Sequence, residues 1–196
     1  MDVQAKLQPP GAGLPLLEWA FAKYIFFPRL FKNTSKEQAI AAFAERSEQI
    51  MTLARSLSPE QLGQRRLVPR LRGLEDSSRY WSTAMVLEHL VIVGDLMRRA
   101  VVELSAGGTD MAKIGTAQVK PDPDADAAGA IEHFAQMSQR FVREATAADI
   151  YAYPQAKYAH PWFGPLNAHQ WLVFAEPHQY IHLQQIKEII ARLHVQ

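Results

Sequence analysis

The sequence predicts a single all-α domain, built as a bundle of four or five helices. Apolar residues recur at helical spacing in several long stretches, and loops rich in Pro, Gly or Arg separate these stretches. No stretch alternates apolar and polar residues for more than a few positions, as a half-buried strand would. The chain has 196 residues, 48% of them hydrophobic, and is long enough to bury one core. Long helices joined by loops are typical of a bundle.

The N-terminal part predicts a lead-in followed by a first helix. Residues 1–13 are polar and rich in Pro and Gly, so we expect a flexible segment before a single domain over residues 14–196. The segment lacks the apolar stretch of a signal peptide. Apolar residues then recur near helical spacing over residues 14–27, and we expect Pro28 to end or kink this helix. Charged residues interrupt the run, which favours a helix packed on the bundle over a membrane segment.

The second helix has a clear start signal. Thr34 is followed three positions later by Glu37, and Ser35 by Gln38, and both spacings are those of a capping box. The apolar stripe that follows predicts a helix to about Leu57.

A short extra helix and a long loop come next. Ser58 can cap a new turn that has Pro59 at its first position. We then expect an irregular connection over residues 63–80. A solvated loop with local ion pairs is favoured there over an anion-facing patch, although an anionic substrate contact would be sought in it. The connection carries five arginines, Arg65, Arg66, Arg70, Arg72 and Arg79.

The third and fourth helices are separated by a loop over residues 107–125. The third helix, residues 82–105, is apolar almost all round before Arg98, which predicts a position in the middle of the core. Asp124 or Asp126 is expected to open the fourth helix, which has an apolar stripe and continues to about residue 146.

The last helix follows an aromatic, Pro-rich loop over residues 150–167. Asn167 can cap this helix, which we expect to end near Leu193. Pro177 lies inside it, so we expect a kink or a restart there. The alternative is a helix that begins at Pro177, with the preceding segment separate.

Charge and composition exclude several classes of function. Lys plus Arg number 21 and Asp plus Glu number 20, so there is no broad basic field and we expect no nucleic-acid partner. The absence of cysteine excludes disulfides, thiolate metal ligands and cysteine nucleophiles, and fits a cytoplasmic location. Phosphate-binding Gly loops, nucleophile elbows and zinc-finger spacings are also absent.

Three histidines suggest a metal site. His178 and His182 are four residues apart on an apolar helix face, the spacing at which two imidazoles can hold one ion. The pair alone is a weak signal, and two ordinary histidines at a groove are an equal alternative. His89, also inward-facing, adds a third imidazole from another core helix. A ligand set of three nitrogens leaves a position open, as in catalytic sites, and suits Zn, Ni, Cu or Fe(II) rather than Ca or Mg.

Other polar and aromatic residues are candidates for a pocket around the ion, with ordinary structural contacts as the alternative for each. The orienting acceptors of the imidazoles cannot be assigned from spacing. The pocket candidates are His160, Trp162, Glu88 and Gln185.

Two segments resemble the DinB/YfiT-like superfamily. The first is the run WSTAMVLEHLVIVG, in which the inward His89 lies in a helix opened by Trp and Ser. The second and more specific is HPWFGPLNAHQWLVFAEPHQYIHLQQI, where an FG turn leads into a helix with the pattern H-x-x-x-H-x-x-Q. The likeness covers residues 20–193 approximately, and Pro177 departs from it.

The resemblance implies an up-down four-helix bundle whose histidines, by position His89, His178 and His182, bind a divalent metal, often nickel or zinc. Relatives include metal-dependent thiol transferases and isomerases, so a small-molecule substrate and a low-molecular-weight thiol are implied. Homodimers are common in such families, and a homodimer is expected by analogy only.

Three functions stay open at this point. The first is a metal-dependent transferase or hydrolase in which the ion activates a thiol or water. The second is a non-catalytic metal-binding or stress-associated protein, and the third is a helical interaction module that binds no metal. A structural metal favours four protein ligands, and the sequence offers no evident fourth, which favours the enzyme.

Overall fold

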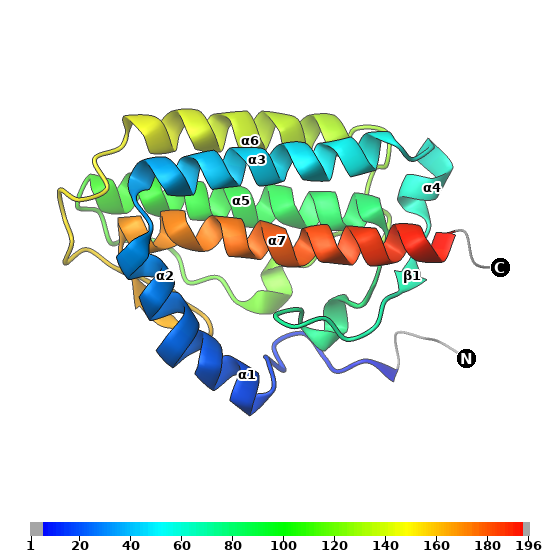
Figure 1. Ribbon diagram of the computed structural model, residues 1–196, viewed down its shortest axis with the longest axis horizontal. Coiled ribbons are helices and arrows are strands. Elements are labelled where there is room, and N and C mark those ends of the chain that lie inside the picture. Colours follow the sequence, from blue (N-terminus) through cyan, green and yellow to red (C-terminus); the bar gives the residue numbers. More distant parts are fainter. Residues whose placement is uncertain (1–5, 194–196) are drawn as a thin grey trace.

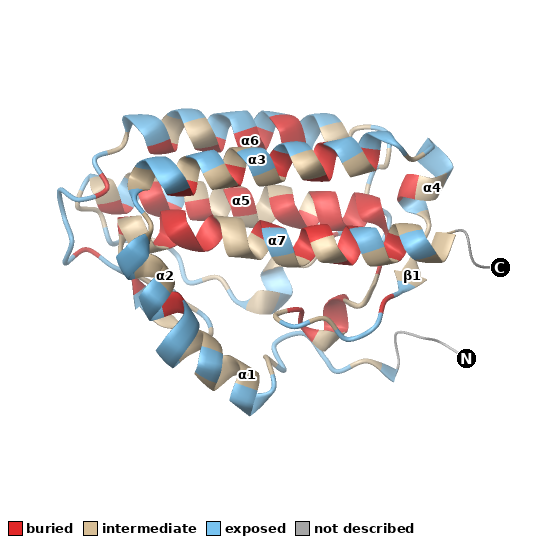
Figure 2. Cartoon of the chain, in the orientation of Figure 1, coloured by how far each residue is buried: buried red, intermediate tan, exposed pale blue. Residues whose placement is uncertain are grey.

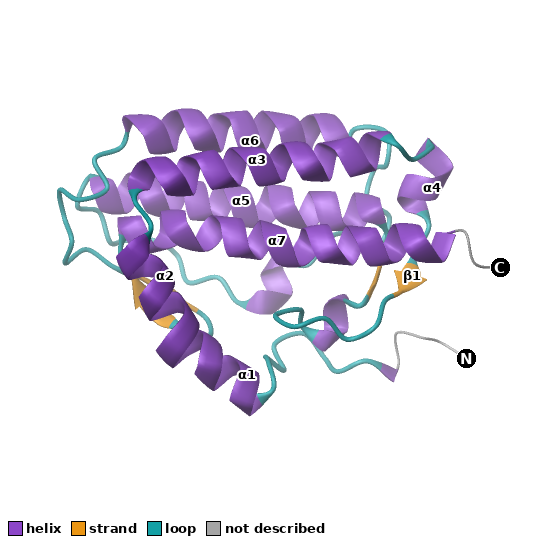
Figure 3. Cartoon of the chain, in the orientation of Figure 1, coloured by secondary structure: helices purple, strands orange, loops and turns teal. Residues whose placement is uncertain are grey.

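The protein is a four-helix bundle with a helical arm at its N-terminus. The computed structural model describes residues 6–193, so the ends of the predicted lead-in and domain lie outside the described residues. The predicted all-α bundle is confirmed (Figure 1, Figure 3). Its four long helices are α3 (Lys36–Arg55), α5 (Thr83–Ser105), α6 (Ala130–Ala147) and α7 (Ala168–Leu193).

Each long helix packs on two others: α5 and α3 both contact α6 and α7. Helix directions alternate along the chain except between α5 and α6, which run the same way (Figure 1). The long connection from residue 106 to residue 129 therefore crosses the length of the bundle. Two hydrogen bonds fit this arrangement: Lys36 Nζ, at the start of α3, donates to the carbonyl of Thr146 at the end of α6, and Arg66, before α5, donates to the carbonyl of Arg192 at the end of α7.

The N-terminal arm is one helical run, formed by α1 (Leu16–Phe21), the π-helical turn η2 (Ala22–Phe26) and α2 (Phe27–Asn33). The expectation that Pro28 ends this helix is wrong. Pro28 is the second residue of α2 and follows the π turn closely, so the change from π- to α-helical bonding falls where the proline lacks its N–H.

Side-chain caps set several helix starts as predicted. The Ser35 hydroxyl accepts from the Gln38 N–H, and the Gln38 side chain accepts from the Ser35 N–H. Ser58 makes the same box for the short extra helix α4 (Pro59–Gly63). Asn167 and Gln170 bond reciprocally at the start of α7.

Two boundaries differ from expectation. Helix α6 begins at Ala130 rather than at Asp124 or Asp126, because the Asp126 carboxylate accepts from the N–H groups of Ala128 and Gly129 and so closes a turn before the helix. Helix α7 continues without interruption through Pro177, so the expected restart and the alternative of a helix that begins at Pro177 are both wrong, while the kink stays a prediction.

Two short hairpins are additions that the sequence did not predict. Strands β1 (Arg66–Leu67) and β2 (Tyr80–Trp81) pair antiparallel and enclose the 3₁₀ turn η3 (Asp76–Ser78). Strands β3 (Tyr158–His160) and β4 (Gly164–Leu166) pair within the aromatic loop before α7. A second 3₁₀ turn, η4 (Thr116–Val119), lies in the crossover connection.

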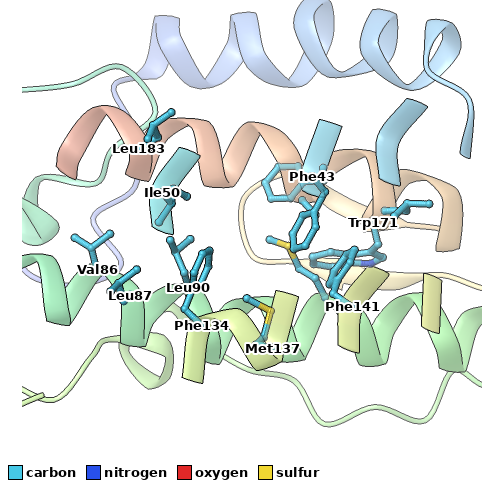
Figure 4. Close-up of a cluster of buried hydrophobic side chains, with 14 of the residues drawn as sticks. Phe43, Ile50, Val86, Leu87, Leu90, Phe134, Met137, Phe141, Trp171 and Leu183 are labelled. Carbon is cyan, nitrogen blue, oxygen red and sulfur yellow. The ribbon is translucent and has the colours of Figure 1, made fainter. Parts of the chain in front are cut away.

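The core lies between the four long helices, whose inward faces are buried (Figure 2, Figure 4). Phe43 of α3 and Phe141 of α6 stack with ring centroids 4.1 Å apart. Helix α5 is buried over most of its first half, in agreement with its apolar sequence. The largest fully buried side chains include Phe43, Ile50, Leu87, Leu90, Phe134, Phe141, Leu183 and Ile186.

The arginine-rich connection is bonded both within itself and to distant segments, so only part of it matches the predicted solvated loop with local ion pairs. Arg70 pairs with Glu18 of α1, and Arg79 pairs with Asp76 at 2.8 Å. Arg72 is exposed.

The described part of the lead-in lies on the same connection, because the Gln8 N–H donates to Asp76. Its flexibility stays a prediction. None of the described helices is long and apolar enough to cross a membrane.

Candidate metal centre

The structure brings the three predicted histidines together. His89 lies on α5, and His178 and His182 lie one turn apart on α7, which packs against α5. Each offers a ring nitrogen within 4.8 Å of the other two. The Nε2 atoms of His89 and His178 are 3.3 Å apart. The fold therefore converges three imidazoles on one point, while their role as ligands is argued below as a proposal.

Two of the imidazoles are oriented by acceptors behind them. His89 Nδ1 lies 2.7 Å from the Val119 carbonyl oxygen, and His182 Nδ1 lies 2.8 Å from Gln185 Oε1. The Gln185 side chain donates from Nε2 to the Ser78 carbonyl oxygen at 2.7 Å, so its oxygen must face His182. Because a carbonyl oxygen only accepts, both rings carry their proton on Nδ1 and present an Nε2 lone pair to the shared point.

Burial keeps these rings uncharged. Desolvation lowers the pKa of His89 to about 4, against a raising effect of the Val119 bond and with a further lowering by the nearby Lys120 charge. The pKa values of His178 and His182 are also well below their ordinary value, first through burial and then through the neighbouring histidines. Neutral imidazoles at neutral pH have lone pairs available for an ion.

An indole ring and a buried ion pair support the site from one side. The Trp81 ring lies parallel to that of His182, with an interplanar angle of 6° and centroids 6.1 Å apart. Lys120 Nζ sits 5.2 Å from the Trp81 ring centroid and bonds Glu75 at 2.6 Å. It also bonds the Ser78 hydroxyl at 2.9 Å. This ion pair joins the crossover loop to the β1–β2 connection.

The three histidines line a cavity of about 420 Å³. His160 and Trp162, two of the pocket candidates, line it as well. Gln185 does not, because it stands behind His182. The prediction that Glu88 belongs to the pocket is wrong: it does not line the cavity, and its carboxylate accepts from the Asp122 N–H at 2.9 Å. One residue along a helix turns the side chain by about 100°, so Glu88 cannot share the face of its neighbour.

Several groups that contact or orient the histidines could not be predicted from the sequence. The Val119 and Ser78 acceptors are backbone carbonyls, which carry no residue signal. Lys120 and Glu75 come from separate loops that no spacing relates. The Trp81 signal was present, since this residue directly precedes the cap of the helix that carries His89.

The donor set fits a divalent transition ion. Three neutral nitrogens suit zinc, nickel or iron(II), whereas calcium and magnesium prefer oxygen. In residues 6–193 no other group of three or more His, Cys, Asp or Glu side chains is placed to hold a metal ion. Fold and site together define a four-helix bundle with a three-histidine group suited to a divalent metal at the wall of a cavity.

Comparison with known proteins agrees with this class. The DinB superfamily profile matches residues 42–186, so the chain belongs to the DinB superfamily, and the resemblance seen in the sequence is confirmed. No curated protein sequence matches the chain.

Two solved structures share the fold. YfiT from Bacillus subtilis, described as a probable metal-dependent hydrolase with an unusual four-helix bundle topology, is 17% identical with a TM-score of 0.59 and covers 82% of this chain and 90% of its own. TT2238, described as a four-helix bundle protein, is 21% identical with a TM-score of 0.53 and covers 78% of this chain and 98% of its own.

Proposed function

We propose that this protein is a metal-dependent enzyme in which His89, His178 and His182 hold one divalent ion and a bound water or thiol is activated for attack on a small molecule. Nickel or zinc is the favoured ion, with iron as a further candidate. The observation that carries the proposal is the convergence of three imidazole nitrogens at the wall of a cavity large enough for a substrate.

The ligand number supports catalysis over a purely structural role. A structural ion is usually enclosed by four protein ligands, whereas a catalytic one keeps a position open. In the described residues the site offers three, and all three also line the cavity. A substrate in the cavity would therefore have direct access to the ion.

Each residue has a defined part in this proposal. The Val119 and Gln185 acceptors hold the His89 and His182 rings with Nε2 turned to the ion. Trp81 packs against the His89 and His182 rings, with ring centroids 5.1 Å and 6.1 Å away. The ion would act as a Lewis acid and lower the pKa of the bound water or thiol. A low-molecular-weight thiol as co-substrate is supported by the sequence resemblance alone, as is a homodimer.

Elemental analysis of protein purified without a metal-affinity tag tests the ligand set. We expect one divalent ion per chain in the wild type, and its loss in His89→Ala and in His182→Ala. The control is His169→Ala, because His169 lies on α7 but bonds the Thr34 carbonyl oxygen away from the site. Retention of the ion by the two site variants would refute the ligand assignment.

Activity then separates an enzyme from a non-catalytic metal protein. Wild type and His182→Ala would be screened for thiol transfer and for hydrolysis with and without the ion restored. We expect turnover that requires both the ion and His182. A stoichiometric ion with no turnover in either screen would favour the metal-binding or stress-associated alternative.

A further inference from the structure

The cavity in front of the histidines is walled mainly by apolar side chains. Phe163 from the β3–β4 hairpin and Trp171 and Phe174 from α7 line it. The N-terminal arm adds Phe21 and Phe26, which are 55% and 41% exposed and therefore border its opening. A site with these walls gains free energy by taking up an apolar ring, through burial and through ring-to-ring contacts.

Most charged side chains of the cavity are already neutralised by partners. Glu18 pairs with Arg70, and Glu75 pairs with Lys120. A strongly polar substrate body would lose its hydration without finding free partners in the middle of the cavity. Arg72, exposed at the edge, is the lining charge without an ion-pair partner in the described residues.

His160 is the exception within this apolar wall. Its Nδ1 accepts from the Trp162 N–H at 3.1 Å, so in the neutral ring the proton is on Nε2. Burial lowers the pKa of His160 to about 3, so the ring is neutral at neutral pH. Rings surround it, with centroids 4.9 Å away for Phe163 and 4.7 Å away for Phe174. Within the described residues its Nε2–H has no acceptor.

We propose that the cavity binds a compact aryl or alicyclic substrate with one carbonyl-type acceptor, held by the aromatic wall and hydrogen-bonded by the His160 Nε2–H. This rests on the proposed function, because it names the substrate class of the same site. A neutral donor in apolar surroundings favours a ligand that carries an acceptor, because a ligand without one leaves the N–H in the cavity unpaired. His160 is thus a specificity-determining residue for the substrate's acceptor.

Three matched probes test this with the full-length protein. Acetophenone has a ring and a carbonyl, ethylbenzene has the ring without the acceptor, and acetone has the carbonyl without the ring. Dissociation constants would be measured by ligand-observed NMR with metal-free protein and again with zinc added. We expect acetophenone to bind more tightly than ethylbenzene by roughly 2- to 10-fold, the contribution of one such hydrogen bond. Acetone should bind most weakly.

Two variants assign the difference to His160. His160→Phe keeps a ring but removes the donor, and should abolish the preference for acetophenone over ethylbenzene, because the carbonyl then loses its hydration without finding a partner. His160→Gln keeps an N–H near the position of Nε2 and should restore a preference for acetophenone. Circular dichroism and the thermal midpoint check that both variants fold, and the Gln variant keeps the test decisive if the Phe variant does not.

The outcomes separate this inference from the proposed function. If acetone binds as tightly as acetophenone, or if the preference for acetophenone persists in His160→Phe, the substrate class is wrong. Absence of binding by either aromatic probe would overturn it as well. If the metal-free protein binds the aromatic probes with the expected preference but the protein does not bind zinc, the inferred substrate class is supported and the metal-dependent function is contradicted.

Discussion

Replacement of Gln185 by leucine should weaken metal binding without removing any ligand. Gln185 is fully buried and links two groups, accepting from His182 Nδ1 at 2.8 Å and donating to the Ser78 carbonyl at 2.7 Å. Leucine fills similar space but removes both bonds, so the His182 ring loses the contact that fixes its orientation. Loss of such an orienting partner typically costs about 10- to 100-fold in metal affinity, or about 1.4–2.8 kcal/mol.

The same substitution should also destabilise the metal-free protein. The Ser78 carbonyl is left without its side-chain donor, and a buried group left unpaired costs about 1–3 kcal/mol. Urea unfolding of the chelator-treated protein measures this term separately. Zinc affinity is then measured by competition with a chromophoric chelator at fixed pH.

Gln179→Leu is the matched control for this prediction. Gln179 is a buried glutamine on the same helix, but it bonds the Ser47 hydroxyl on α3 at 3.0 Å, away from the cavity. The Gln179→Leu variant should lose about as much free energy of unfolding as Gln185→Leu and keep its zinc affinity. The reasoning fails if Gln185→Leu changes zinc affinity by less than about twofold, well under the effect of an orienting partner. It fails equally if the control loses as much affinity.

Three further predictions concern the loops around the site. Lys120→Met should lower the free energy of unfolding by about 3 kcal/mol, measured in urea, because Glu75 keeps a buried charge without its partner. Burial raises the pKa of Glu75, but bonds from Lys120, Ser77 and a backbone N–H lower it more, to a net value below the ordinary 4.5. Its contribution is therefore complete above pH 4.5 and is lost as pH falls through the folded pKa, so Glu75→Gln should flatten the decline of stability in that acid range. Gly73→Ala should cost about 1–2 kcal/mol, since φ is +83° and the new Cβ would lie 2.5 Å from Ile181, whereas Gly63→Ala, with open space, should not lower the thermal midpoint.

The bundle and the convergence of the histidines follow from local signals in the sequence. The Ser35 and Ser58 caps and the apolar stripes fix where α3, α4 and α5 begin and which faces turn inward. The i, i+4 spacing of His178 and His182 places both on one face of α7. A third inward histidine on α5 then needs only the packing of these two helices to complete the group.

Some helix boundaries, and the contacts that orient the histidines, could not be predicted because the residues involved can adopt more than one local structure. Asp126 can cap a helix or close a turn, and here its carboxylate accepts from the N–H groups of Ala128 and Gly129 and closes a turn before α6. Pro28 and Pro177 are breakers by rule, yet a π turn precedes the first and the second lies within an unbroken helix. The Val119 carbonyl is placed by the path of a 24-residue connection, residues 106–129, which no local pattern encodes.

The ammonium group of Lys120 lies next to the acceptors that orient two of the imidazoles. Lys120 follows Val119, whose carbonyl accepts from His89, and its Nζ bonds the hydroxyl of Ser78, whose carbonyl accepts from Gln185 behind His182. The crossover loop and the β1–β2 connection are thus joined at Lys120, which also bonds Glu75 and the Ser77 hydroxyl. Because the helices alone set only which residues face the cavity, the aim of the nitrogens depends on these loops. Metal affinity should therefore respond to loop substitutions that leave the hydrophobic core and its helices intact.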